Sequence, residues 1–175
     1  MSEQAYSGWD KNLDFQEWIK RLIALVGDMT IEARKRAYYA IFLTQLGNGS
    51  RIGEAVDCMI KWVGNGKVEQ SVRVEKRKDN YHRLMIIPPI IRKDAEIKQA
   101  MQEIAKFKNP KAAAEMFLHR AQELNTHAFR YSFISHNSDK PAQLIASMTG
   151  HKKLDHILHY TNRKAGEQEL RRLFK

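Results

Sequence analysis

Apolar residues recur at helical spacing through the first part of the chain. One run covers residues 13–26, and a second starts after the candidate N-cap Thr30 and ends at Gly47. Side chains three and four residues apart share one face of a helix, so both runs predict helices. The turn sequence at 47–50 follows, and a third apolar run begins directly behind it. Arg51 is therefore expected in the first turn of a third helix.

The middle of the chain has a different pattern. Val68, Val72 and Val74 lie at even spacing among polar residues, which is typical of a half-buried strand. The apolar segment 84–87 is expected to be its antiparallel partner. The segment between them, 75–81, is highly charged and predicts the exposed tip of a hairpin.

Helical spacing returns after the hairpin. Helices are expected over 94–107, 109–124, 126–136, 141–149, 154–158 and close to the C-terminus. The first eleven residues show no period. We therefore expect a flexible N-terminal arm (1–11) followed by one domain (12–175). The fold class is mainly α with a small antiparallel β-sheet, an α+β arrangement.

Composition narrows the class of protein. The chain has 175 residues and a formal net charge of +10, which indicates a polyanionic partner. Its cations are distributed over several predicted elements and do not form one helix face opposite an apolar stripe. This favours double-stranded DNA over a membrane surface. A single cysteine, Cys58, excludes a disulfide framework and a zinc site with several cysteines.

No secretory leader is visible, and Pro88 and Pro89 interrupt the longest apolar stretch. The sequence therefore predicts no membrane association and a cytoplasmic location.

Five polar residues are candidates for catalysis, although each also has an ordinary structural interpretation. Arg51 follows a glycine-rich turn and fits a surface position. His127 and Arg130 are three residues apart, so on a helix they share a face and suit a single anion. His151 follows a glycine, and Tyr160 fits a core tyrosine with one hydrogen bond. Taken singly, none of them identifies a site.

Their order and spacing resemble the tyrosine recombinases, the phage-integrase family. Residues 49–55 resemble the family's first arginine motif, in which a glutamate follows the arginine by three residues. Residues 126–130 resemble its His-x-x-Arg box, and 149–151 its Gly-His box. Tyr160 stands nine residues further on, where the family has its nucleophile. The predicted basic hairpin lies where the family has its catalytic lysine, and the resemblance extends from about residue 13 to the C-terminus.

The resemblance implies the recombinase catalytic fold and a site-specific recombinase or integrase. Such an enzyme cleaves and rejoins DNA through a covalent 3′-phosphotyrosine. Arg51 and Arg130 would hold the non-bridging phosphate oxygens, and Tyr160 would attack phosphorus. His127 would accept a proton or hold the phosphate, and His151 would donate a hydrogen bond to it. No metal, ATP or other cofactor is implied.

The resemblance also implies a lysine that gives a proton to the departing 5′-hydroxyl. Lys76 and Lys78 fall on the same side of an extended strand, in phase with the preceding valines. The family's usual distance to the following arginine, here Arg83, favours Lys78 over Lys76. A solvated hairpin tip is the structural alternative for both lysines.

Three positions depart from the family pattern or have a structural interpretation. Tyr131 stands where many members carry a histidine, so it is a rival nucleophile. Gly53 replaces a small polar residue, and we expect it to cost a little helix propensity. Glu54 is interpreted as a structural residue that pairs with an arginine.

The resemblance bears on partners as well. An N-terminal core-binding domain is expected to be absent, because eleven polar residues cannot form one. Other protomers, as a tetramer on DNA, are expected partners, and the tail 163–175 fits docking on a neighbour or on its own domain. Two alternatives stay open: type IB topoisomerase-like nicking and resealing, and a basic DNA-binding module without catalysis. The location would be the nucleoid, or the host-cell cytoplasm for a viral protein.

Overall fold

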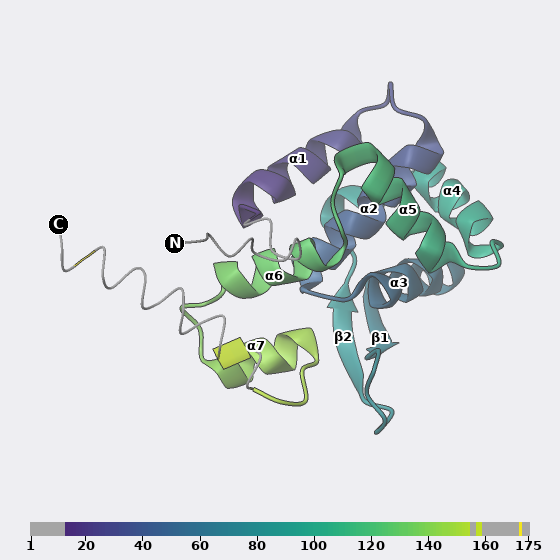
Figure 1. Ribbon diagram of the computed structural model, residues 1–175. Coiled ribbons are helices and arrows are strands. Elements are labelled where there is room, and N and C mark those ends of the chain that lie inside the picture. Colours follow the sequence, from purple (N-terminus) through teal and green to yellow (C-terminus); the bar gives the residue numbers. More distant parts are fainter. Residues whose placement is uncertain (1–12, 155–156, 159–171, 173–175) are drawn as a thin grey trace.

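The computed structural model describes residues 13–154, 157–158 and 172 (Figure 1). In this part of the chain the elements follow the order α1 (Phe15–Gly27), α2 (Ala33–Asn48), α3 (Ile52–Asn65), β1 (Glu69–Arg73), β2 (His82–Ile86), the 3-10 turn η1 (Pro89–Ile91), α4 (Ala95–Ala105), α5 (Pro110–Gln122), α6 (His127–His136) and α7 (Ala142–Thr149). The predicted fold class, mainly α with a small antiparallel sheet, is confirmed. The predicted arm, 1–11, lies outside the described residues.

Helix α2 is the centre of the helical layer (Figure 1). It contacts α1, α3, α4, α5 and α6, and its residues are buried without interruption from Arg36 to Leu46. A helix that is covered on every side needs no single apolar stripe, because each of its faces has a neighbour. The other helices are therefore arranged around α2.

Aromatic rings join four of these helices. Phe42 of α2 lies 6.0 Å from Phe129 of α6 and 6.2 Å from Phe117 of α5, measured between ring centres. Trp18 of α1 meets Phe129 edge-to-face at 5.4 Å. Removing these large apolar surfaces from water supplies much of the stability of the core. The contacts of Phe129 with Trp18 and Phe42 also fix the position of α6, which carries part of the candidate site.

A buried arginine anchors the opposite end of α2. Arg36 is 1% exposed, pairs with Asp94 and Glu96 at the start of α4, and donates from Nε to the Val26 carbonyl at 2.8 Å. A buried charge is costly unless it is paired and hydrogen-bonded. This arrangement therefore fixes the ends of α1 and α4 against α2.

The two strands form a hairpin that projects from the helical layer (Figure 1). They are antiparallel, and Val72 lies opposite Arg83. Both strands alternate between exposed and buried residues, and the buried face packs against α3. The base of the hairpin is therefore fixed against the helices.

One predicted helix start is wrong and another is confirmed. Thr30 does not cap the second helix, since α2 begins at Ala33 and the Thr30 hydroxyl donates to the Asp28 carboxylate at 2.6 Å. Asn109 does cap α5, because its side-chain oxygen accepts from a backbone N–H inside the first turn and Pro110 needs no such bond. A short polar side chain is able either to cap a helix or to bond within a local turn, and the sequence alone does not show which of the two it does.

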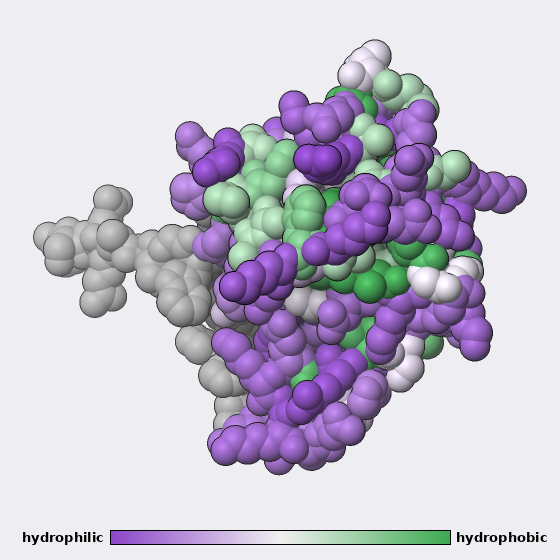
Figure 2. Space-filling model, turned by 90° about the vertical axis from the view of Figure 1, so that its right-hand side faces the viewer, coloured by the Kyte–Doolittle hydropathy of each residue, from purple (hydrophilic) through white to green (hydrophobic). Residues whose placement is uncertain are grey.

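The surface agrees with the charged composition. Figure 2 shows a face covered largely by hydrophilic side chains, with small hydrophobic areas between them. Within the described ranges, no helix has the length and apolar character needed to cross a bilayer.

Candidate active site

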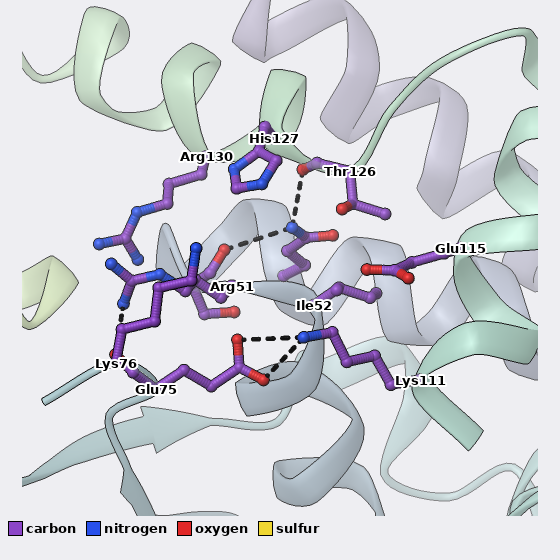
Figure 3. Close-up of a pocket in the computed structure, with 11 residues that line it drawn as sticks. Arg51, Ile52, Glu75, Lys76, Lys111, Glu115, Thr126, His127 and Arg130 are labelled. Atoms are coloured by element: carbon purple, nitrogen blue, oxygen red, sulfur yellow. Dashed lines mark hydrogen bonds and ion pairs between the residues drawn. The ribbon is translucent and has the colours of Figure 1, made fainter. Parts of the chain in front are cut away.

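A small pocket of about 50 Å³ lies where α3, the hairpin, α5 and α6 meet. Its lining includes Arg51, Lys76, Lys111, His127 and Arg130. Figure 3 shows the side chains of Arg51, Lys76 and Arg130 extending into the same part of the pocket, with His127 beside them. The structure therefore brings two predicted motifs, far apart in sequence, to one place.

Arg51 is the N-cap of α3 and so lies one residue before the first turn, where the sequence predicted it. Its Nη1 donates to the Glu75 carbonyl at 3.0 Å and to the Glu54 carboxylate at 3.3 Å. Glu54 is fully buried and also pairs with Arg83 at 3.3 Å. The prediction that Glu54 is a structural partner of an arginine is confirmed. Its carboxylate holds Arg51 at the edge of the pocket.

The turn before Arg51 requires glycine at position 49. Gly49 has a φ of +57°, and a Cβ there would lie 2.3 Å from the Phe133 ring. We expect Gly49→Ala to reduce the free energy of unfolding by about 2–4 kcal/mol, from left-handed backbone strain and overpacking. Denaturant unfolding measures the change. Gly47→Ala is the matched control, because nothing lies within 4 Å of its Cβ position, and it should stabilise α2 by about 0.5–1 kcal/mol. Equal effects at both positions would contradict this account.

Arg130 comes from α6 and is 4% exposed. Its Nη1 donates to the Gly49 carbonyl at 3.0 Å, and its Nη2 lies 3.2 Å from the His151 ring. Burial, and secondarily the charge of Arg51, lowers the pKa of Arg130 to about 9. The positive charge of Arg51 disfavours the charged form of Arg130, so an anion bound between the two guanidinium groups would offset this repulsion.

His127 lies in the first turn of α6 and lines the pocket. Partial burial lowers the pKa of its imidazole, and the positive charges of Lys76 and Arg51 lower it further. A histidine with a lowered pKa is neutral at pH 7 and is able to accept a proton or a hydrogen bond.

His151 follows Gly150, the left-handed cap of α7. One of its ring nitrogens lies 2.6 Å from the Thr149 hydroxyl, and the ring also contacts Arg130. A Cβ at Gly150 would lie 2.7 Å from a methyl group of Val74. The Gly-His turn therefore packs closely against the hairpin, and His151 reaches the pocket through Arg130.

The two candidate lysines have different positions. Lys76 lines the pocket beside His127 and Arg130, whereas Lys78 is not among the lining residues. Both are exposed, and Lys76 has a φ of +63°. The structure therefore does not support the sequence-based preference for Lys78.

The predicted nucleophile, Tyr160, lies outside the described residues, as does the tail 163–175 apart from Arg172. The rival hydroxyl, Tyr131, is half-buried on α6, with its ring centre 6.4 Å from that of His127. Both tyrosines stay candidates on this geometry.

Sequence reasoning missed the part that Arg83 has in the site. Besides pairing with Glu54, its guanidinium donates to the carbonyl of Asn48 at 2.9 Å and to that of Met148. It thereby links the hairpin to α2, α3 and α7. Arg83 occupies an inward-facing position of the strand, and an arginine at such a position is the signal that was available. In the described part of the chain, histidine, cysteine and carboxylate side chains form no cluster of three or more suited to a metal ion.

Sequence comparison agrees with this geometry. No protein-family model matches the chain. It is 35% identical over 172 residues to the protein named "Putative integrase ORF241" of Acidianus two-tailed virus, covering 94% of this chain and 68% of that protein. It is also 30% identical over 207 residues to "Uncharacterized protein MJ0770" of Methanocaldococcus jannaschii, covering 98% of this chain and 92% of that protein.

Among solved structures, the XerH site-specific recombinase, crystallised on a palindromic difH substrate as a post-cleavage complex, matches with a TM-score of 0.55 at 15% identity. The match covers 97% of this chain and 56% of XerH, so the chain spans little more than half of that recombinase. The fold is that of a tyrosine recombinase catalytic domain. With its integrase relative, this places the chain in the tyrosine recombinase family of integrases.

Proposed function

We propose that the chain is the catalytic domain of a site-specific recombinase that cleaves and rejoins DNA through a 3′-phosphotyrosine. The observation that carries the proposal is the pocket, which gathers Arg51, Arg130, His127 and Lys76 around one space, with His151 bonded to Arg130. These are the charges and proton carriers that phosphoryl transfer from DNA to a tyrosine needs.

The reaction follows from the properties of these groups. Arg51 and Arg130 offer fixed, positively charged donors to the non-bridging oxygens, which gain charge in the transition state. The Tyr160 oxygen bonds to phosphorus while the bond from phosphorus to the 5′-oxygen breaks. His127, neutral at pH 7, accepts the tyrosine proton, and a lysine ammonium protonates the 5′-oxygen. Because the ester is transferred and not hydrolysed, rejoining is the same step in reverse.

Lys76, in place of Lys78, is the proposed proton donor. We expect Lys76→Ala to slow cleavage of a nicked suicide substrate by about 100-fold or more, the usual scale of general acid catalysis. Lys78→Ala, the matched control two residues away, should stay within about threefold of the unmodified protein, because exposed charges far from the reacting atoms act weakly. The rate of appearance of a denaturation-resistant protein–DNA adduct, without added metal, is the measurement. If Lys78→Ala slows cleavage and Lys76→Ala does not, Lys78 is the proton donor.

The same assay separates the alternatives. A type IB topoisomerase-like enzyme would form the adduct and relax supercoiled plasmid, yet give no recombinant product on paired sites. A non-catalytic module would bind duplex DNA and form no adduct. The integrase relative favours recombination over both.

Partners and location follow from the same chemistry. The net charge of +10 suits a duplex, and the XerH structure contains its DNA substrate. A synaptic complex of several protomers, a tetramer on DNA, is the proposed working form. It would act in the cytoplasm, at the nucleoid or in an infected host cell.

A further inference from the structure

An ion pair that belongs to none of the family motifs borders the pocket. The Lys111 ammonium, from the first turn of α5, lies 3.1 and 3.4 Å from the two carboxylate oxygens of Glu75 on the hairpin. Both residues line the pocket, and Figure 3 shows the pair below Arg51. The pair joins α5 to the residue directly before Lys76.

Glu75 is also held through its backbone. Its N–H donates to the Glu54 carboxylate at 3.2 Å, and its carbonyl accepts from Arg51 at 3.0 Å. A Cβ at Gly53 would lie 1.9 Å from a carboxylate oxygen of Glu75. Glycine at position 53 therefore leaves the space that the Glu75 carboxylate occupies when it reaches Lys111. This explains a residue that helix propensity alone disfavours.

The direction of the Lys76 side chain depends on this anchoring. Lys76 has a φ of +63°, a conformation that residues with a side chain adopt only where their surroundings impose it. The backbone bonds fix the position of Glu75, while the ion pair with Lys111 holds its carboxylate against α5. With Glu75 held on both sides, the chain turns at Lys76 and its ammonium enters the pocket.

We infer that the Glu75–Lys111 ion pair positions Lys76 for proton transfer to the 5′-oxygen. Lys111 and Glu75 are thus positioning residues that act through Lys76. This inference rests on the proposed function. The pair is partly exposed, 42% at Lys111 and 27% at Glu75, so its loss should change the chemistry much more than the folding stability.

A substrate with a sulfur atom at the bridging 5′ position tests the inference. A thiolate leaves without help from an acid, so such DNA does not need the lysine proton. We expect Lys111→Met and Glu75→Gln each to slow cleavage of ordinary DNA by about tenfold, a partial loss of general acid catalysis. On the sulfur substrate both variants, like Lys76→Ala, should return to within about threefold of the unmodified protein. The double variant Lys111→Met, Glu75→Gln should cleave ordinary DNA about as slowly as either single variant, because both changes break the same ion pair.

Two control variants accompany the test. Lys111→Arg retains the cation and should keep most of the activity. Lys106→Ala removes a comparable surface pair, with Glu103 at 2.8 Å on α4, and should change neither substrate. Circular dichroism melting confirms that each variant is folded.

The outcomes separate the two proposals. If sulfur restores Lys76→Ala and does not restore Lys111→Met, then Lys111 acts on the phosphate itself and the positioning role is overturned. If sulfur fails to restore Lys76→Ala, Lys76 is not the proton donor, so the positioning role is overturned while the proposed function stands. If the unmodified protein forms no adduct, the proposed function is overturned and the positioning role with it.

Discussion

Replacing Tyr160 with phenylalanine is expected to abolish the covalent adduct, because in the proposed reaction its phenolic oxygen is the atom that bonds to phosphorus. Loss of a nucleophile that works with several other groups lowers a rate by more than about 1,000-fold. A denaturing gel of protein mixed with a nicked suicide substrate shows the adduct as a shifted band. A mobility-shift assay should show that Tyr160→Phe still binds duplex DNA.

Tyr131→Phe is the matched control, since it removes the hydroxyl of the rival tyrosine, whose ring lies beside that of His127. It should retain adduct formation. If the adduct persists in Tyr160→Phe and is lost in Tyr131→Phe, the nucleophile has been assigned to the wrong tyrosine. Peptide mapping of the adduct then identifies the modified residue directly.

Replacing either pocket arginine is expected to have the second-largest effect. Arg51→Ala and Arg130→Ala should each slow cleavage by at least about 100-fold, the cost of removing one preorganised donor from a developing oxyanion. The rate of adduct formation at saturating DNA measures this, because it reports the chemical step and not the affinity.

Arg130 needs a second variant because it is buried and bonded to Gly49 and His151. Arg130→Lys keeps a charge and loses the two-pronged donor, so it should fold and still cleave slowly. Arg21→Ala is the control, as Arg21 bonds Gln122 and lies over Trp18 outside the pocket. Full cleavage by a folded Arg130→Ala would contradict the assignment.

Most of the helices and the hairpin could be predicted from the sequence, because each shows the spacing of apolar residues that is typical of a helix or a strand. It did not show that α2 lies at the centre. The burial of α2 on all sides depends on five other helices, and its own pattern does not specify those contacts.

The motifs predicted that Arg51 and Arg130 would meet, and the pocket confirms this. The structure puts Lys76 and not Lys78 at the pocket, and the physical reason lies in the end of the strand. Alternation along a strand puts Lys76 and Lys78 on the same side, but β1 ends at Arg73 and the backbone turns at Lys76. Side chains alternate between two faces only within a strand, so this alternation does not predict the direction of residues that follow its end.

Contacts between residues far apart in the sequence also could not be predicted. Glu75 and Lys111 are 36 residues apart, and nothing in either local sequence indicates that they pair. The same holds for Arg83, whose partners come from three helices. Such pairs depend on how the elements pack, which a single sequence does not encode locally.

The bonds that Arg130 makes to Gly49 and His151 have a thermodynamic consequence. These bonds within the folded chain hold the Arg130 guanidinium in place, so its rotamer freedom is lost during folding and not when substrate arrives. Calorimetry of a small oxyanion such as vanadate should therefore reveal association with little entropic penalty from this side chain. Variants that release it should bind the same ion with a less favourable entropy.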